Sequence, residues 1–135
     1  MKIDVRYYTQ TGNSKKLADS IAKELGVVAK SIDEPMNEKA DILFLCNSVY
    51  WAGIDKHVKQ FIKKNSNNIG ELVNVSTAAL IESTYSQMKN VAADAKVKLS
   101  DKEFHCRGSF TALHAGHPDA ADLAAANKFA KGFCE

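Results

Sequence analysis

The sequence predicts an α/β fold in which five parallel strands alternate with helices that cover both faces of one sheet. Segments with apolar residues at strand spacing alternate with segments that carry them at helical spacing. The connections are short, and the chain has no repeat, linker or low-complexity tract, so parallel β-α-β units are expected. A length of 135 residues suits one substantial core, and we expect a single domain over residues 1–135.

The first strand and the first helix are separated by a short polar loop. Apolar residues alternate along residues 2–8 and predict a strand, although its aspartate and arginine are unusual if the strand is central. Residues 13–26 place apolar side chains four apart on one side, which predicts a helix. Asn13 or Ser14 is the expected N-cap, and Gly26 is expected to end the helix.

The second β-α unit is short, and the third is strongly apolar. Residues 27–32 predict a short strand, and residues 34–40 predict a turn or at most a brief helix. The compact apolar run at 41–48 is typical of a strand buried on both faces. Residues 54–65 carry apolar side chains on one helical side and predict the next helix.

The fourth strand is expected at residues 69–77, where Glu71 and Asn74 weaken the apolar pattern. Apolar residues then recur at helical spacing along 83–97, which predicts a helix.

The last unit is the least apolar one. Residues 102–110 predict a fifth strand at an edge of the sheet, and residues 117–133 predict an alanine-rich helix. Pro118 suits the first turn of that helix. Asp119 and Asp122 are favourable partners for the positive end of its dipole.

Composition and charge exclude several classes of protein. The net charge is only +2, and no basic block with interleaved aromatics is present, so we expect no nucleic-acid partner. No apolar run approaches the roughly 18 residues of a membrane helix, and we expect neither a membrane span nor a signal peptide. The three widely spaced cysteines indicate reduced thiols and a cytoplasmic protein.

The cysteines and histidines do not form a recognisable metal motif. Cys46 ends a buried strand and is expected in the core, and Cys134 is expected to be an exposed thiol. For Cys106, beside Arg107, either a lowered pKa or a structural role is open. The histidines of the segment 114–117 have ligand-like spacing, but a metal site needs three or four clear ligands, so we expect none.

The loop at residues 8–14 has the composition of an anion site. It leads into a helix N-terminus, which offers backbone N–H groups and about half a positive charge. Its hydroxyl, amide and glycine residues would suit a phosphate, and Lys15 and Lys16 in the first helical turn would be stabilised by a bound dianion. The alternative is an ordinary helix cap with incidental lysines.

The known dinucleotide and P-loop patterns are absent. Both require at least two glycines at fixed spacing, and Gly12 stands alone in its loop. A single phosphate held by hydroxyl groups therefore fits a mononucleotide better.

The segment "TQTGNS", between the first strand and the first helix, closely resembles the phosphate loop of the flavodoxin family. The likeness continues at "NSVYWAGIDKHVKQFI" after the third strand and at "VSTAA" after the fourth. It extends over essentially the whole chain. The resemblance implies a short-chain, flavodoxin-like, doubly wound five-stranded parallel sheet in the order 2-1-3-4-5, with FMN as the cofactor.

The resemblance assigns cofactor contacts to three loops. The residues that would bind the phosphate of FMN are Thr9, Gln10, Thr11, Gly12, Asn13 and Ser14. The residues that would line one side of its ring are Ser48, Val49, Tyr50, Trp51, Ala52 and Gly53. The residues that would line the other side through backbone groups are Ser76, Thr77 and Ala78.

Aromatic and glycine residues in the second of these loops suit a flavin ring. Adjacent aromatics in a loop, Tyr50 and Trp51, are natural stacking partners, whereas the alternative for Trp51 is a partly buried surface side chain. Two roles fit Gly53: it could let the preceding peptide reorient toward the flavin at low cost, or it could simply end the loop.

Two departures from the family pattern keep other functions open. The third loop has no stacking aromatic before Tyr85, and the chain is slightly basic, whereas flavodoxins that carry electrons are usually acidic. The leading hypothesis is a monomeric FMN-binding carrier of single electrons between larger redox proteins, without catalytic residues of its own. The alternatives are an FMN-dependent reductase of small molecules and a flavodoxin-like interaction domain without cofactor.

A phosphoacceptor signalling domain shares this strand order but requires an aspartate at the end of the third strand. The chain has Cys46 and Asn47 there, so this class is excluded.

Overall fold

One sheet of five parallel strands organises the part of the chain that the computed structural model describes, which is residues 1–8, 12–49, 54–78, 84–107 and 118–133. In chain order the elements are β1 (Ile3–Tyr7), α1 (Asn13–Leu25), β2 (Lys30–Ser31), β3 (Ala40–Val49), α2 (Lys56–Lys64), the 3-10 helix η1 (Ser66–Asn68), β4 (Ile69–Ala78), α3 (Tyr85–Ala95), β5 (Phe104–Arg107) and α4 (Ala120–Gly132). The strand order is β2-β1-β3-β4-β5, so the predicted doubly wound α/β fold is confirmed.

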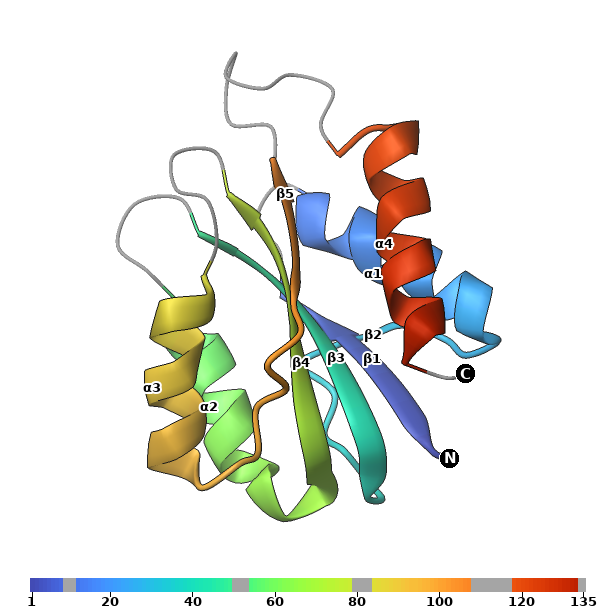
Figure 1. The fold of residues 1–135 in the computed structure, drawn as a ribbon. Coiled ribbons are helices and arrows are strands. Elements are labelled where there is room, and N and C mark those ends of the chain that lie inside the picture. Colours follow the sequence, from blue (N-terminus) through green and yellow to red (C-terminus); the bar gives the residue numbers. More distant parts are fainter. Residues whose placement is uncertain (9–11, 50–53, 79–83, 108–117, 134–135) are drawn as a thin grey trace.

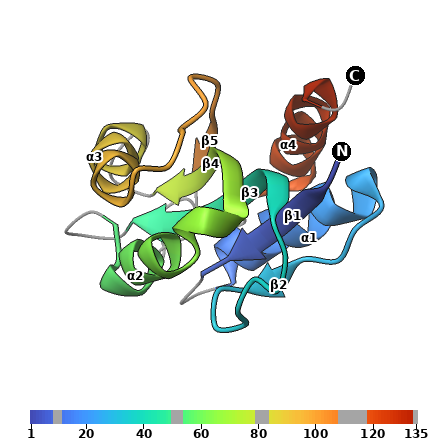
Figure 2. The same cartoon turned by 90° about the horizontal axis from the view of Figure 1, so that it is seen from below.

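The helices form a layer on each side of the sheet. Figure 1 shows α1 and α4 together on one face and α2 and α3 together on the other, and Figure 2 shows the same three layers from below. Because each helix runs back against the strands, α1, α2, α3 and α4 begin at the edge where β1, β3, β4 and β5 end. This carboxyl edge is where the predicted loops meet.

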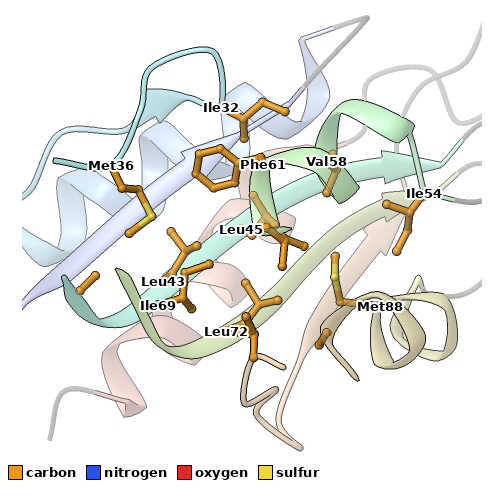
Figure 3. Close-up of a cluster of buried hydrophobic side chains, with 14 residues drawn as sticks. Ile32, Met36, Leu43, Leu45, Ile54, Val58, Phe61, Ile69, Leu72 and Met88 are labelled. Carbon is orange, nitrogen blue, oxygen red and sulfur yellow. The ribbon is translucent and has the colours of Figure 1, made fainter. Parts of the chain in front are cut away.

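A separate apolar cluster lies on each face of the sheet. On the α2/α3 face, Leu43, Leu45 and Leu72 of the sheet pack against helix side chains that include Phe61 and Met88 (Figure 3). On the α1/α4 face the cluster consists of Val5, Leu17, Ala18, Ile21, Ala22, Ile42, Phe44, Cys46, Val73, Val75, Ala126 and Ala130. β3 contributes alternate residues to both clusters, which confirms that this apolar run is buried on both faces.

Several element ends differ from the sequence prediction. The second strand is limited to Lys30 and Ser31, because Val27 and Ala29 pack against the α1/α4 cluster instead of pairing with β1. Residues 34–40 form no helix, in agreement with the predicted turn. The N-cap of α1 is Gly12 and not Asn13 or Ser14.

The last helix also starts later than predicted. Its N-cap is Asp119, so Pro118 precedes the helix and does not lie in its first turn. The Asp119 carboxylate accepts from the backbone N–H of Asp122, and the Asp122 carboxylate accepts from that of Asp119, each at 2.9 Å. The two aspartates thus form a reciprocal capping box, in which each satisfies a backbone donor at the helix start.

Arg6 and Asp4 form a charged pair in β1, which lies between β2 and β3 in the sheet. The Arg6 side chain is 3% exposed, and its Nε donates to both carboxylate oxygens of Asp4 at 3.1 Å. Its Nη1 donates to the backbone carbonyls of Ser31 and Glu34, and its Nη2 donates to that of Pro35. The guanidinium therefore fixes the turn that follows β2, and its ion pair and hydrogen bonds explain how a charged residue lies in this strand.

We expect Arg6→Met to lower the free energy of unfolding by about 3 kcal/mol, because it leaves the Asp4 carboxylate and three carbonyls without their donor. Urea denaturation measures the effect. Lys30→Met, at the exposed position paired with Arg6 across the ladder, should change stability by no more than about 0.5 kcal/mol. Equal effects of the two substitutions would contradict this role of Arg6.

Candidate functional site

A chain of hydroxyl groups joins three segments at the carboxyl edge of the sheet. Ser14, in the first turn of α1, lies 2.5 Å from the Ser48 hydroxyl, measured between the two Oγ atoms. Ser48 Oγ in turn lies 2.8 Å from Thr77 Oγ1. Ser48 and Thr77 are opposite each other in the β3–β4 ladder, and Ser14 and Thr77 are almost fully buried. The fold thus connects one residue from each of the three predicted cofactor loops.

The hydroxyl chain retains a donor. Each of the three hydroxyls carries one proton, and two hydrogen bonds between them use two of these protons. Among the described residues, one proton is therefore left for another acceptor at this edge. Such a donor suits an anionic or carbonyl oxygen.

A second cluster of polar side chains lies on the opposite face of β3 and β4. The Nδ2 of Asn47 donates to Asn74 Oδ1 at 2.8 Å, and the Nδ2 of Asn74 donates to Thr84 Oγ1 at 2.9 Å. Thr84 Oγ1 donates back to Asn47 Oδ1 at 3.1 Å, which closes a ring of three fully buried side chains. This ring joins β3, β4 and the residue that precedes α3, so it fixes both ends of the third predicted loop.

The ring also changes the interpretation of the fourth strand. Asn74 was expected to weaken this strand, but both of its amide groups are satisfied within the core. Residue Glu71 is partly exposed, and its carboxylate lies 3.6 Å from the Lys98 Nζ. Neither residue interrupts the β3–β4 ladder.

Ser76 has a buried hydroxyl without a hydrogen-bond partner among the described residues. It lies beside Asn47 across the ladder and is fully buried. A buried hydroxyl that makes no hydrogen bond costs about 1–3 kcal/mol, so such groups are rare, and a further partner would satisfy this one.

The backbone at the start of α1 leaves room for a ligand to come close to it. Gly12 has φ 92°, a left-handed conformation that favours glycine, and a Cβ placed there would meet open space. Asn13 and Ser14 follow it as buried residues. A helix N-terminus that opens on a glycine, beside buried polar side chains, can accept an anion.

Of the two lysines in the first turn of α1, Lys15 forms an ion pair and Lys16 does not form one within the described residues. The Lys15 ammonium lies 2.7 Å from the Asp19 carboxylate, one turn along α1, and this bond raises the pKa of Lys15. Lys15 is therefore already paired within the helix. Lys16 is exposed, and its ammonium is available to a ligand or to solvent.

Part of the predicted site lies outside the described residues. These positions are Thr9, Gln10, Thr11, Tyr50, Trp51, Ala52 and Gly53, together with the histidine segment 114–117 and Cys134. For Val49 and Ala78 the structure describes the backbone, and the two residues pair in the β3–β4 ladder. The predictions for the phosphate loop and for the stacking aromatics therefore stay predictions.

An aromatic and acidic cluster that the sequence did not indicate flanks the carboxyl edge. The Tyr8 ring stacks on the His57 ring, with centroids 5.6 Å apart. The Asp55 carboxylate is 2.7 Å from His57 Nδ1 and accepts from the His57 backbone N–H at 2.8 Å, which caps α2. Burial alone would raise the pKa of Asp55, but the hydrogen bonds from His57 and Tyr8 outweigh it and lower that pKa.

Both described cysteines are structural. Cys46 is fully buried, and burial raises the pKa of its thiol far above the ordinary value. Burial also raises the pKa of Cys106 to about 12, with the carboxylates of Asp122 and Asp119 adding to the effect. The alternative of a lowered pKa for Cys106 is therefore wrong, because desolvation and the two carboxylates raise that pKa.

No three His, Cys, Asp or Glu side chains of the described segments gather into a metal site. The helices of these segments are also too short or too polar to cross a bilayer.

We expect Asp55→Ala to lower the free energy of unfolding by about 1 kcal/mol at pH 7, because α2 loses its side-chain cap. The folded-state pKa of Asp55 is below its ordinary value. Its stabilising effect is therefore present above about pH 4 and is lost as the pH falls through the folded-state pKa.

Urea denaturation of Asp55→Ala and the wild type between pH 3 and pH 7 measures this effect. Asp55→Asn, which can still cap the helix, serves as the control and should lack the pH-dependent part. A difference between Asp55→Ala and the wild type that stays constant over this range would contradict the assignment.

Comparison with known proteins agrees with this geometry. The family model described as "Flavodoxin domain" matches residues 5–130. No curated protein sequence matches the chain.

Solved structures with the same fold have low sequence identity to this chain. A flavodoxin from the domain Archaea is 12% identical with a TM-score of 0.69, and the match covers 96% of this chain and 94% of that one. Oxidised flavodoxin 2 from Bacillus cereus is 17% identical with a TM-score of 0.66, over 99% and 98% of the two chains.

The Trp repressor binding protein of Bacillus subtilis is 16% identical with a TM-score of 0.63, over 95% and 96% of the chains. At these identities the structures share the fold, whereas the family assignment comes from the match over residues 5–130. The chain belongs to the flavodoxin family.

Proposed function

We propose that this protein binds FMN at the carboxyl edge of the sheet and carries single electrons between larger redox proteins. The observation that carries the proposal is the hydroxyl chain of Ser14, Ser48 and Thr77, which links the three loops that the resemblance assigns to FMN. Membership of the flavodoxin family supports a flavin as the ligand.

The described residues fit such a ligand. The hydroxyl chain keeps one donor proton, the Ser76 hydroxyl lacks a partner among the described residues, and Gly12 leaves open space at the start of α1. A phosphate needs donors near a helix N-terminus, and a flavin ring needs donors for its carbonyl oxygens. Both kinds of donor occur along this edge.

Each part of the site has a separate task in this proposal. FMN supplies the electron-transfer chemistry when bound. The start of α1 holds its phosphate, and the hydroxyl chain sets the spacing between α1 and the ends of β3 and β4. The ring of Asn47, Asn74 and Thr84 keeps the edge rigid, so little reorganisation accompanies binding.

The side chains at the described ends of β3 and β4 are compatible with a carrier. Burial raises the pKa of the Cys106 thiol, and the ends of β3 and β4 present neutral hydroxyl and amide side chains. Such groups orient a cofactor, and they do not transfer protons readily near neutral pH.

An absorbance spectrum tests the proposal. We expect peaks near roughly 370 and 450 nm, the usual flavin pair, after reconstitution with FMN. Ser48→Ala should weaken FMN binding by about 1–3 kcal/mol, because it breaks both bonds of the hydroxyl chain. The corresponding rise in Kd is roughly five- to 150-fold.

Ser20→Ala is the matched control, since the Ser20 hydroxyl bonds to Asn127 between α1 and α4, away from the carboxyl edge. Fluorescence titration with FMN measures both Kd values, and thermal unfolding of each apoprotein separates stability from binding. A protein that takes up no FMN would overturn the proposal. Steady oxidation of a nicotinamide cofactor without a protein acceptor would favour a reductase instead.

A further inference from the structure

The second helix carries an unbalanced positive charge. Of its nine residues, Lys56, Lys59, Lys63 and Lys64 are lysines and none is acidic. All four are exposed, and none forms an ion pair within the described segments. In α1, by contrast, Lys15 is paired with Asp19. The charges of α2 are therefore left for solvent or for another molecule.

The stability of α2 does not account for this pattern. Lysines in the last turn, such as Lys63 and Lys64, interact favourably with the helix dipole. Lys56, in the first turn, opposes the dipole at a cost of about 0.3–1 kcal/mol. The Asp55 carboxylate at the N-cap interacts favourably with the dipole, but the first turn itself has no acidic residue to pair with Lys56. Neither the helix dipole nor an ion pair within the described residues therefore accounts for the charge of Lys56.

Three of these lysines line one wall of a groove between α2 and α3. Lys56, Lys59 and Lys63 follow one another at helical spacing, and the groove has a volume of about 430 Å³. The rise of an α-helix places the first and last of them about 10 Å apart along the axis. We call these three residues the α2 lysine face.

The rest of the groove is mixed in character. Ile54 and Val91 are its apolar lining residues, and Ile54 belongs to the same buried cluster as Met88 (Figure 3). The opposite wall is formed by Gln87, Asn90 and Asp94 of α3. A small apolar centre with a polar rim is typical of protein–protein interfaces.

The α2 lysine face is close to the proposed electron-transfer edge. α2 begins at the carboxyl edge of the sheet, as Figure 1 shows, and Asp55 caps it directly before Lys56. The chain leads into Ile54 from the residues 50–53 that the resemblance places at the flavin ring. A partner seated on this face would therefore contact the protein beside the proposed flavin.

We propose that the α2 lysine face is the docking surface for an electron-transfer protein that presents a cluster of carboxylates. Its role in electron transfer rests on the proposed function, whereas docking itself needs only the surface. Charge complementarity steers such partners together and fixes their orientation. The acidic partner side chains lie along Lys56, Lys59 and Lys63, and an apolar side chain enters between them against Ile54 and Val91.

A protein fits this surface better than a nucleic acid does. The lysine face is about 10 Å long, and the net charge of the chain is only +2. An apolar centre and amide side chains also suit a folded protein surface.

The test uses the FMN-loaded protein on a gold electrode coated with a carboxylate-terminated monolayer, which stands in for an acidic partner. At about 10 mM salt the wild type should adsorb and give a flavin wave, because screening is weak there. The triple variant Lys56→Glu, Lys59→Glu, Lys63→Glu should lose at least about tenfold in adsorbed mass and in current. At about 150 mM salt the wild type should lose most of its adsorption.

A charge-matched control separates the surface from the net charge. The variant Lys30→Glu, Lys39→Glu, Lys128→Glu changes three exposed lysines outside α2 and has the same net charge. It should keep most of the adsorption and the wave. Equal losses in the two triple variants, or no loss in the α2 variant, would overturn the proposal.

A microbalance under the same electrode separates docking from the proposed function. The protein could adsorb through the α2 lysine face and give no flavin wave. This result would support docking and would count against the FMN function. A double-stranded oligonucleotide tests the competing partner. If the wild type bound it more tightly than the carboxylate surface, and if this binding depended on the α2 lysine face, the proposal of an acidic protein partner would be overturned. Circular dichroism spectra verify that all variants are folded.

Discussion

The need to satisfy buried polar groups is the constraint on which the carboxyl edge depends. Inside a core, an unpaired amide or hydroxyl costs about 1–3 kcal/mol, so polar side chains there must find partners of fixed geometry. Asn47 and Asn74 meet this requirement only when β3 and β4 are in one register and Thr84 lies over them. The ring therefore specifies the register at the same edge where the site is formed.

The two halves of β3 and of β4 have different tasks. Toward the amino ends, the apolar clusters on both faces hold the helices to the sheet through non-directional burial. Toward the carboxyl ends of β3 and β4, hydroxyl and amide side chains replace the apolar ones, and directional bonds take over. This change of chemistry along a strand allows a firm core and a polar ligand edge to coexist.

Charge in this protein is organised by segments, although the net charge is small. In β1 the Arg6 guanidinium is paired within the fold, and in α1 Lys15 is paired along the helix. In α2 the lysines stay unpaired within the described residues. An overall +2 thus conceals a local positive surface beside the proposed flavin edge, which a count of charges could not reveal.

The sequence by itself determined the alternation of strands and helices, because apolar periodicity records which side of each element is buried. It also indicated Ser14, Ser48 and Thr77, each through its own loop and the family resemblance. Only the tertiary structure decided that their hydroxyls join, that Asn74 completes a ring, and that Tyr8 stacks on His57. Contacts between residues far apart in the chain depend on register and packing, which local periodicity does not encode.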